Sequence, residues 1–405
     1  RSVIKHKQDS TISSKIKRGI TMTFNLDIAI VASYMVFCLV IGLFKFGTIK
    51  NIRDYTLGTK PFSTIVLTAT TLATVFGAGH VIGHIGKVHQ LGLIYIIPFI
   101  FAPLSWLILA KFLAPNLEMF RRHRFISLSD IMNYWYGRVG RWDTNIISIL
   151  LSTAVTATSA MAIGYILHYF IGVSESFGMI IGLVVVTIYS TFGGITSVAF
   201  TDVFQFLIFF LVLPIACFIG YQKTGGIKEI WFSLPRTHVQ IPTKNIPLFI
   251  SFAFYALMPA IDIAFIQRAL IAKSKKQFLQ TFVGVACLNV PLLIAISLIG
   301  LIAYHDAPNM ESDKVLYYFI DHFLPFGLKG LLVSGLLAAI MSTQDSYLNT
   351  TSALISHDVC KQIWSSLTDK QESLIARIAC MIIAITATLL VFWGKGIMGI
   401  IWFLD

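Results

Sequence analysis

One apolar segment near the C-terminal end of the sequence concentrates the side chains that could do chemistry. The segment reads AAIMSTQDSYLNTTS and holds Asp345 among Ser, Thr and Asn residues. At helical spacing, four of its polar residues share one face: Ser342, Asp345, Ser346 and Asn349. Bonding of a hydroxyl to the carbonyl four residues earlier accounts for one or two of these groups and not for their density. The pattern indicates an oxygen-rich face on an apolar helix.

Oxygen ligands suit hard cations, so a sodium ion or a proton fits the chemistry of this face. Zinc and copper sites use grouped His and Cys side chains, whereas the ten His and five Cys are dispersed along the sequence. The sequence also lacks the G-x-x-x-x-G-K-[ST] loop that holds nucleotide phosphates. We therefore expect an ion-coupled process that uses neither ATP nor an organic cofactor.

The composition places this face in a membrane. Hydrophobic residues make up 56% of the 405 residues and charged residues 12%, whereas soluble domains carry about 25% charged residues. The net charge of +12 would suit nucleic acid in a soluble protein, but here the basic residues lie in short segments between apolar runs. That distribution is typical of cytoplasmic loops. We expect an all-α polytopic protein whose partners are the lipid bilayer and small solutes, with no nucleic acid.

Ten segments are apolar over the roughly 20 residues that a helix needs to cross a bilayer. They lie near residues 26–46, 63–86, 91–114, 144–172, 177–193, 200–221, 246–266, 281–304, 328–355 and 375–394, followed by a stub at 397–405. The amphipathic segment 313–325 is too short to cross, so we expect it to lie on the outer surface.

Basic residues are divided unevenly between alternate loops. Sixteen Lys and Arg lie in the loops at 45–60, 121–141, 268–276 and 361–377, and eight lie at 87, 223–244, 314–329 and 395. The positive-inside rule makes the first set cytoplasmic and places the start of the first span outside.

Two of the spans carry interruptions. The second contains ATVFGAGHVIG, with Gly77, Gly79 and Gly83 close together, and the seventh contains YALMPAIDIAFIQR, with Pro259 in its middle. Secondary transporters are often built from inverted repeats whose first helices break near the bilayer midplane. Five spans separate the two starts, and a repeat with an odd number of spans must be inverted. The alternative is that these Gly and Pro residues serve close helix packing.

Asp202 opens the sixth span. An ionisable side chain at bilayer depth costs roughly 2.5 to 3.5 kcal/mol and therefore needs a partner or a function. The alternative for Asp202 is a helix cap near the interface. Asp345 lies too deep in its span to act as a cap.

Four ordered motifs together resemble the sodium:solute symporter family, which includes sodium/glucose, proline and pantothenate carriers. They are LATVFGAGHVIG (72–83), IYSTFGGITSVAFTDVFQF (188–206), FIQRALIAKSKK (265–276) and GLLAAIMSTQDSYLNTTSALISHDVCK (335–361). The resemblance covers roughly Asn25 to the end of the chain. It implies a leucine-transporter-like five-plus-five inverted repeat with one extra N-terminal helix, and it implies a carrier rather than an enzyme.

The resemblance also implies site residues. The main sodium site would use the carbonyls of Ala73, Phe76 and Ala339 and the hydroxyls of Ser342 and Thr343. A second cation site would use Asp202, Ser342, Asp345 and Ser346, where either a second cation binds or one carboxyl is held protonated by its neighbour. The substrate would lie beside the broken helices, near Gly77, Ala78, Gly79, His80, Tyr255, Pro259 and Asp262. His80 matches a His of the family's sugar carriers, or it caps the broken helix.

The implied function is sodium-coupled symport of a small organic solute by alternating access, in a plasma membrane and most simply a bacterial inner membrane. The solute could be an amino acid such as proline, a sugar or a carboxylate, and a proton could replace sodium. The alternatives are a symporter-fold sensor that signals to a partner and an inactive truncated carrier. A pore is less well supported because the sequence shows no continuous filter or charged rings.

The two ends of the chain carry separate expectations. Residues 1–21 are polar and basic and precede Met22, so we expect a disordered or non-native leader and one transmembrane domain over 22–405. The chain stops a few residues into an apolar segment that begins near Gly396. We therefore expect that most of the last core helix is missing.

Overall fold

The computed structural model describes residues 26–44, 49–59, 61–259 and 261–393, and its regular elements in these ranges are all helices. The expected leader at 1–21 and the stub at 397–405 lie outside the described residues. The first part of the chain forms α2 (Leu26–Phe44), α3 (Ile52–Leu57), α4 (Thr64–Val75), η1 (Gly79–Gly83), α5 (His84–Leu91), α6 (Leu93–Ile100), α7 (Ala102–Leu113), η2 (Ala114–Asn116), α8 (Leu117–Arg122) and α9 (Leu128–Ile171).

The second part of the described chain continues with α10 (Glu175–Lys223), α11 (Ile227–Ser233), α12 (Arg236–Val239), η3 (Thr243–Asn245), α13 (Ile246–Leu257), α14 (Ile263–Ile271), α15 (Lys275–Asp306), η4 (Ser312–Lys314), α16 (Val315–Phe323), α17 (Leu328–Leu354), η5 (Ile355–Cys360), α18 (Lys361–Ile363) and α19 (Asp369–Trp393). The elements η1 and η5 are short π-helices.

Every predicted span coincides with a helix or with a broken helix pair. Within the described ranges, six helices are long and apolar enough to cross a membrane, or seven when the bent pair at 64–91 is one span. The count of ten is higher for three reasons. The helix α10 holds two predicted spans that Gly194 separates at φ 54°, α13 and α14 share one span, and α17 carries too many polar residues to stand out by hydropathy. The chain is a multi-pass membrane protein.

The two predicted interruptions are confirmed. Phe76 ends α4 with φ −86° and ψ 54°, and the chain bends by 66° before continuing through η1 into α5. In the seventh span, α13 ends at Leu257 and α14 begins only at Ile263. Both breaks expose backbone groups in the middle of a span, where the hydrocarbon layer offers no water to bond them.

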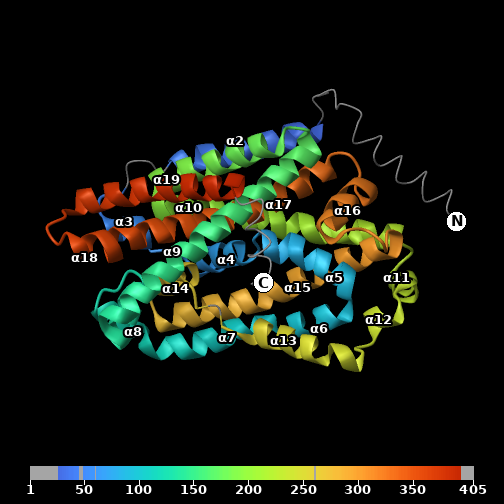
Figure 1. Cartoon of the computed structure of the whole chain (residues 1–405), viewed down its shortest axis with the longest axis horizontal. Coiled ribbons are helices and arrows are strands. Elements are labelled where there is room, and N and C mark those ends of the chain that lie inside the picture. The colour runs from blue at the N-terminus through green and yellow to red at the C-terminus, as the bar shows by residue number, and fades with distance from the viewer. Residues whose placement is uncertain (1–25, 45–48, 60, 260, 394–405) are drawn as a thin grey trace.

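The helix α17 lies inside the bundle, packed against α2, α4, α9, α10 and α19 (Figure 1). Every residue from Leu332 to Leu354 is buried. The elements α3, α8 and α18 gather at one end of the bundle, and α11, α12 and α16 at the other (Figure 1). This arrangement agrees with the predicted alternation of basic and less basic loops. The helix α16 is amphipathic as predicted, with one face buried through Val315, Leu316, Phe319, Ile320 and Phe323.

Candidate functional site

The polar face of α17 points into the bundle. Ser342, Asp345, Ser346 and Asn349 are each 0% exposed. Tyr189 from α10 donates its hydroxyl to Asp345 Oδ2 at 2.7 Å. Because buried polar groups are costly without partners, the sequence pattern is explained by contacts to α4, α10 and α14 and not by exposure to solvent.

The break after α4 meets α17 in a cluster of oxygen atoms. The Ser342 hydroxyl lies 2.8 Å from the carbonyl of Ala73 and 2.9 Å from that of Ala339. The Thr343 hydroxyl lies 3.0 Å from the carbonyl of Thr74 and 3.1 Å from that of Ala339. Each hydroxyl has one hydrogen but contacts two carbonyls, so the cluster holds more acceptors than donors and suits a cation.

Four of the five residues expected at the main sodium site therefore lie together, and Thr74 joins them. The fifth, Phe76, lies at the end of α4, where its non-helical ψ turns its carbonyl away from the helix direction. Gly77 follows and packs directly on α17, since a Cβ placed there would lie 2.8 Å from Thr343 Oγ1. The absence of a side chain at Gly77 permits this close approach.

The expected second cation site contains a guanidinium group. Arg268 of α14 is 1% exposed, and its Nη2 lies 3.6 Å from Asp202 Oδ2 and 2.5 Å from Ser346 Oγ. Thr70 donates its hydroxyl to the same Asp202 oxygen. Ser346 continues the network to Asp345 Oδ1 at 3.4 Å. Three of the four expected residues thus meet around Arg268, whereas the Ser342 hydroxyl bonds at the α4 break.

The interpretation of Asp202 as a helix cap is wrong. Asp202 lies inside α10 and is 0% exposed, so its partner is a buried arginine and not a helix terminus. Its Oδ1 atom has no hydrogen-bond partner among the described residues. Two acidic residues, Asp202 and Asp345, share the charge of one Arg268 in this network.

Sequence reasoning missed Arg268 because it precedes Lys273, Lys275 and Lys276 and was counted with them as a loop residue. Asp202 and Asp345 lie deep in their spans, and the sequence pattern assigned no basic side chain to either carboxylate. Because buried charges need a partner, these two residues were the signal that pointed to a buried Arg or Lys.

The residues expected to line the substrate site differ in their exposure to solvent. Gly79 and His80 lie on η1 and are exposed, and Tyr255 on α13 is 54% exposed with its ring 6.1 Å from that of Phe99. Gly77 is buried, and Ala78 and Pro259 are partly exposed. Asp262 has a structural role at the start of α14.

Asp262 is the N-cap of α14. Its Oδ1 accepts hydrogen bonds from the amides of Ala264 at 2.8 Å and Phe265 at 3.1 Å. Its Oδ2 accepts from the Tyr347 hydroxyl at 2.7 Å. The carboxylate therefore fixes the second break against α17, which accounts for it without a substrate.

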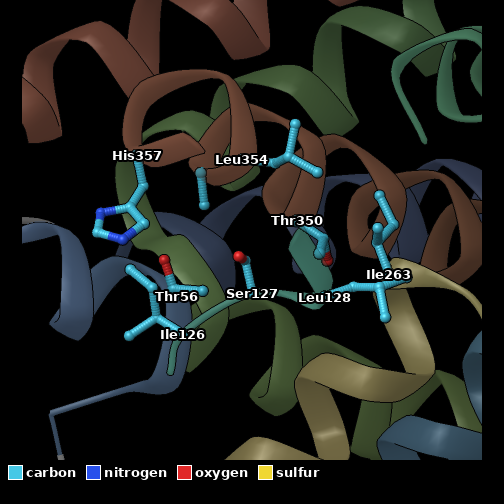
Figure 2. Close-up of a pocket in the computed structure, with 9 residues that line it drawn as sticks. Thr56, Ile126, Ser127, Leu128, Ile263, Thr350, Leu354 and His357 are labelled. Atoms are coloured by element: carbon cyan, nitrogen blue, oxygen red, sulfur yellow. The ribbon is translucent and has the colours of Figure 1, made fainter. Parts of the chain in front are cut away.

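A hydrogen-bond network closes the bundle near α3. Gln267 donates to the carbonyl of Thr56 at 2.8 Å and to Asn349 Oδ1 at 3.2 Å, and the Thr350 hydroxyl donates to Gln267 Oε1 at 2.9 Å. These contacts join α3, α14 and α17 on the side of the basic loops. A small pocket lies beside them, with Thr56, Ser127, Thr350 and His357 on its wall (Figure 2).

The sequence model of the sodium:solute symporter family matches residues 55–404. The chain belongs to this family. A sodium/glucose cotransporter of Vibrio parahaemolyticus is 24% identical over 392 residues, covering 86% of this chain and 70% of the relative. The high-affinity proline transporter PutP of Bacillus subtilis (strain 168) is 25% identical over 386 residues, covering 90% and 80%.

The fold is that of a solved sodium-coupled symporter. A substrate-bound, outward-open sodium-coupled sialic acid symporter superposes with a TM-score of 0.83 at 21% identity, covering 91% of this chain and 81% of the other. The symporter described here therefore has the leucine-transporter-like arrangement predicted from the motifs, preceded by α2. The expectation about the last core helix concerns residues near 396–405, which lie outside the described residues.

Gly77→Ala is expected to weaken sodium binding. The new methyl group would lie 2.8 Å from Thr343 Oγ1 and 3.0 Å from Thr343 Cγ2, and overpacking of this kind costs about 1–3 kcal/mol. A sodium titration of thermal stability would show a higher midpoint for the variant. Adding Thr343→Ser removes the crowded methyl and should restore part of the affinity; an unchanged midpoint in Gly77→Ala would contradict the close packing.

Asp262→Ala is expected to lower stability by about 1–2 kcal/mol, because loss of an N-cap costs roughly that much. Asp262→Asn keeps an oxygen acceptor for the two amides and should be closer to the parent in thermal unfolding. Its solute affinity should also match that of the parent chain; loss of solute affinity in a stably folded Asp262→Asn would make the carboxylate a substrate ligand.

Proposed function

We propose that this symporter couples the inward movement of sodium to the uptake of a small organic solute across a plasma membrane. The observation that carries the proposal is the cluster of oxygen atoms where α4 breaks against α17. Its members are the carbonyls of Ala73, Thr74 and Ala339 and the hydroxyls of Ser342 and Thr343, with the Phe76 carbonyl as a further ligand. Hydroxyl and carbonyl oxygens without a carboxylate suit a monovalent hard cation.

Sodium at this cluster would connect the two repeats, because α4 belongs to the first and α17 to the second. The ion replaces the hydrogen bonds that the two hydroxyls otherwise donate across the interface. It therefore strengthens the contact between α4 and α17, and its release leaves only the weaker neutral hydrogen bonds of Ser342 and Thr343. A change of this kind is the differential interaction that alternating access requires.

The membrane potential would drive the cycle. One positive charge moving inward gains about 2.3 kcal/mol per 100 mV. At about 1.4 kcal/mol per tenfold change, this supports roughly fiftyfold accumulation of a neutral solute.

Arg268 would take the place of a second coupling cation in this cycle. Its guanidinium already lies between Asp202 and Ser346 and cannot lose its charge at physiological pH. We infer that one sodium ion at the α4 break accompanies each solute. Arg268 neutralises Asp202, and Asp345 carries a proton and is therefore uncharged.

The solute would bind beside the two breaks, near Gly79 and His80 of η1 and Tyr255 of α13. These residues are exposed and combine backbone polar groups with aromatic faces, which suits a small polar molecule. The relatives named above carry glucose or proline, so an amino acid and a sugar are the first classes to test.

The proposal is tested by sodium-dependent thermal stability of the purified chain in detergent, with potassium at equal ionic strength as the control. A ligand that binds the folded state raises its apparent stability, so sodium should shift unfolding upward and potassium should not. Proline, glucose and sialic acid are then screened in sodium for a further shift and, in proteoliposomes, for uptake driven by a sodium gradient. Equal behaviour in sodium and potassium would contradict the proposal.

A further inference from the structure

A second group of ionisable side chains lies at the end of α17 that faces the basic loops. Asp130 on α9 and His357 and Asp358 on η5 each offer one ligand atom, and these atoms all lie within 4.8 Å of one another. His357 Nε2 is 3.7 Å from Asp130 Oδ2. At 1.5 Å per helical residue, about 20 Å separate this group from Ser342, so it is distinct from the proposed sodium site.

Asp358 is the member that needs a ligand. Its side chain is 0% exposed, and neither carboxylate oxygen has a hydrogen-bond partner among the described residues. Its backbone is held in place, because Asn145 donates to the Asp358 carbonyl at 3.1 Å. A buried carboxylate without a partner is costly, so the site favours a bound cation.

The neighbouring basic residues are engaged with other carboxylates. Arg141 pairs with Asp130 Oδ1 at 3.3 Å, and Lys361 lies 3.6 Å from Glu372 Oε2. The imidazole is fixed from behind, since His357 Nδ1 lies 2.8 Å from Glu372 Oε1. This contact leaves Nε2 directed toward Asp130, and a carboxylate bonded to the far ring nitrogen is the arrangement found behind metal-ligating His.

We propose that Asp130, His357 and Asp358 bind a divalent transition-metal ion of the Zn²⁺ type, with Glu372 as the residue that positions the imidazole. One imidazole nitrogen and two carboxylate oxygens suit zinc, whereas Mg²⁺ and Ca²⁺ prefer more oxygen ligands. Tetrahedral bonds of about 2.0–2.2 Å place ligand atoms roughly 3.3–3.6 Å apart. The separation of 3.7 Å between His357 Nε2 and Asp130 Oδ2 is close to that range.

The pocket beside the cluster has room for about one water ligand. His357 lies on the pocket wall near the hydroxyls of Thr56 and Ser127 (Figure 2), and its side chain is 26% exposed. The bound ion would join α9 to the end of α17 directly, and α19 through Glu372. Metal binding therefore stabilises the packing of these three elements at this end of the bundle.

The test is a zinc titration of the purified full chain in detergent, in competition with a fluorescent chelator. We expect one saturable zinc site, with Mg²⁺ unable to displace the ion. His357→Gln and Asp358→Asn should each weaken zinc binding at least about tenfold, and Glu372→Gln about tenfold, because residues behind a ligand contribute 10- to 100-fold. The matched control is His322→Gln, which removes an exposed His that lies 3.2 Å from Asp306 outside the cluster; its zinc affinity should be unchanged.

X-ray absorption of the zinc-loaded parent chain keeps the proposal testable even if a variant fails to fold. The expected spectrum has only nitrogen and oxygen neighbours, with the scattering pattern of one imidazole. A sulfur neighbour would place the ion on a cysteine such as Cys360 and overturn the proposal. Absence of saturable binding, or loss of binding in His322→Gln alone, would overturn it as well.

Discussion

Arg268→Gln is expected to abolish transport and to destabilise the folded chain by about 3–5 kcal/mol. The variant leaves Asp202 buried at 0% exposure without its cation, and breaking a buried ion pair from one side costs about that much. It also removes the donor that holds Ser346 at 2.5 Å, so α14 loses one contact with the polar face of α17 and keeps the one between Gln267 and Asn349. Thermal unfolding in detergent and uptake in proteoliposomes measure the two effects.

The double variant Asp202→Asn/Arg268→Gln separates charge from packing. Removing both charges relieves the uncompensated carboxylate, so the double variant should recover much of the stability that Arg268→Gln loses. If Arg268 also replaces a coupling cation, the double variant stays deficient in transport although it folds. Equal stability of the single variant and the parent would contradict the buried ion pair.

Ser342→Ala/Thr343→Ala is expected to eliminate the sodium-specific rise in stability. The variant removes both side-chain oxygens from the cluster and leaves the carbonyls of Ala73, Thr74 and Ala339. Polar contacts to a charged partner are worth about 1.5–3 kcal/mol each, and 1.4 kcal/mol is tenfold. Sodium affinity should therefore fall by at least about a hundredfold, measured as the midpoint of a sodium titration of thermal stability.

Two variants on the same helix serve as controls for this result. Thr343→Ser keeps the hydroxyl and should keep the sodium response. Ser334→Ala removes a buried hydroxyl that has no partner among the described residues, so it tests whether loss of any buried hydroxyl from α17 has the same effect. A full sodium shift in the Ser342/Thr343 double variant would move the ion site elsewhere.

The sequence by itself determined the class of the protein and the positions of its helices. Apolar runs of membrane length are a local property, and so are the Gly and Pro residues that end α4 at Val75 and α13 at Leu257. The i, i+3, i+4, i+7 spacing on α17 is also local, so it places Ser342, Asp345, Ser346 and Asn349 on one face whatever the packing around them.

Only the tertiary structure decided which polar groups meet. Arg268 is 66 residues from Asp202 in the sequence, and its basic neighbours in the loop concealed its burial. The partner of a buried charge depends on how helices pack, which spacing along one helix does not specify. The N-cap role of Asp262 likewise depends on the start of α14 at Ile263, which the sequence pattern does not specify.

Tertiary packing also decides which residues form the proposed metal site. The His residues are dispersed in sequence, so a site with zinc-type ligands was not expected. Packing of α9 against η5 nevertheless brings Asp130 to His357 and Asp358. Local periodicity fixes which way each side chain faces on its own helix. Contacts between helices that are distant in sequence arise from the burial of apolar surface across the whole bundle. The candidate sites depend on those contacts, so only the tertiary structure shows them.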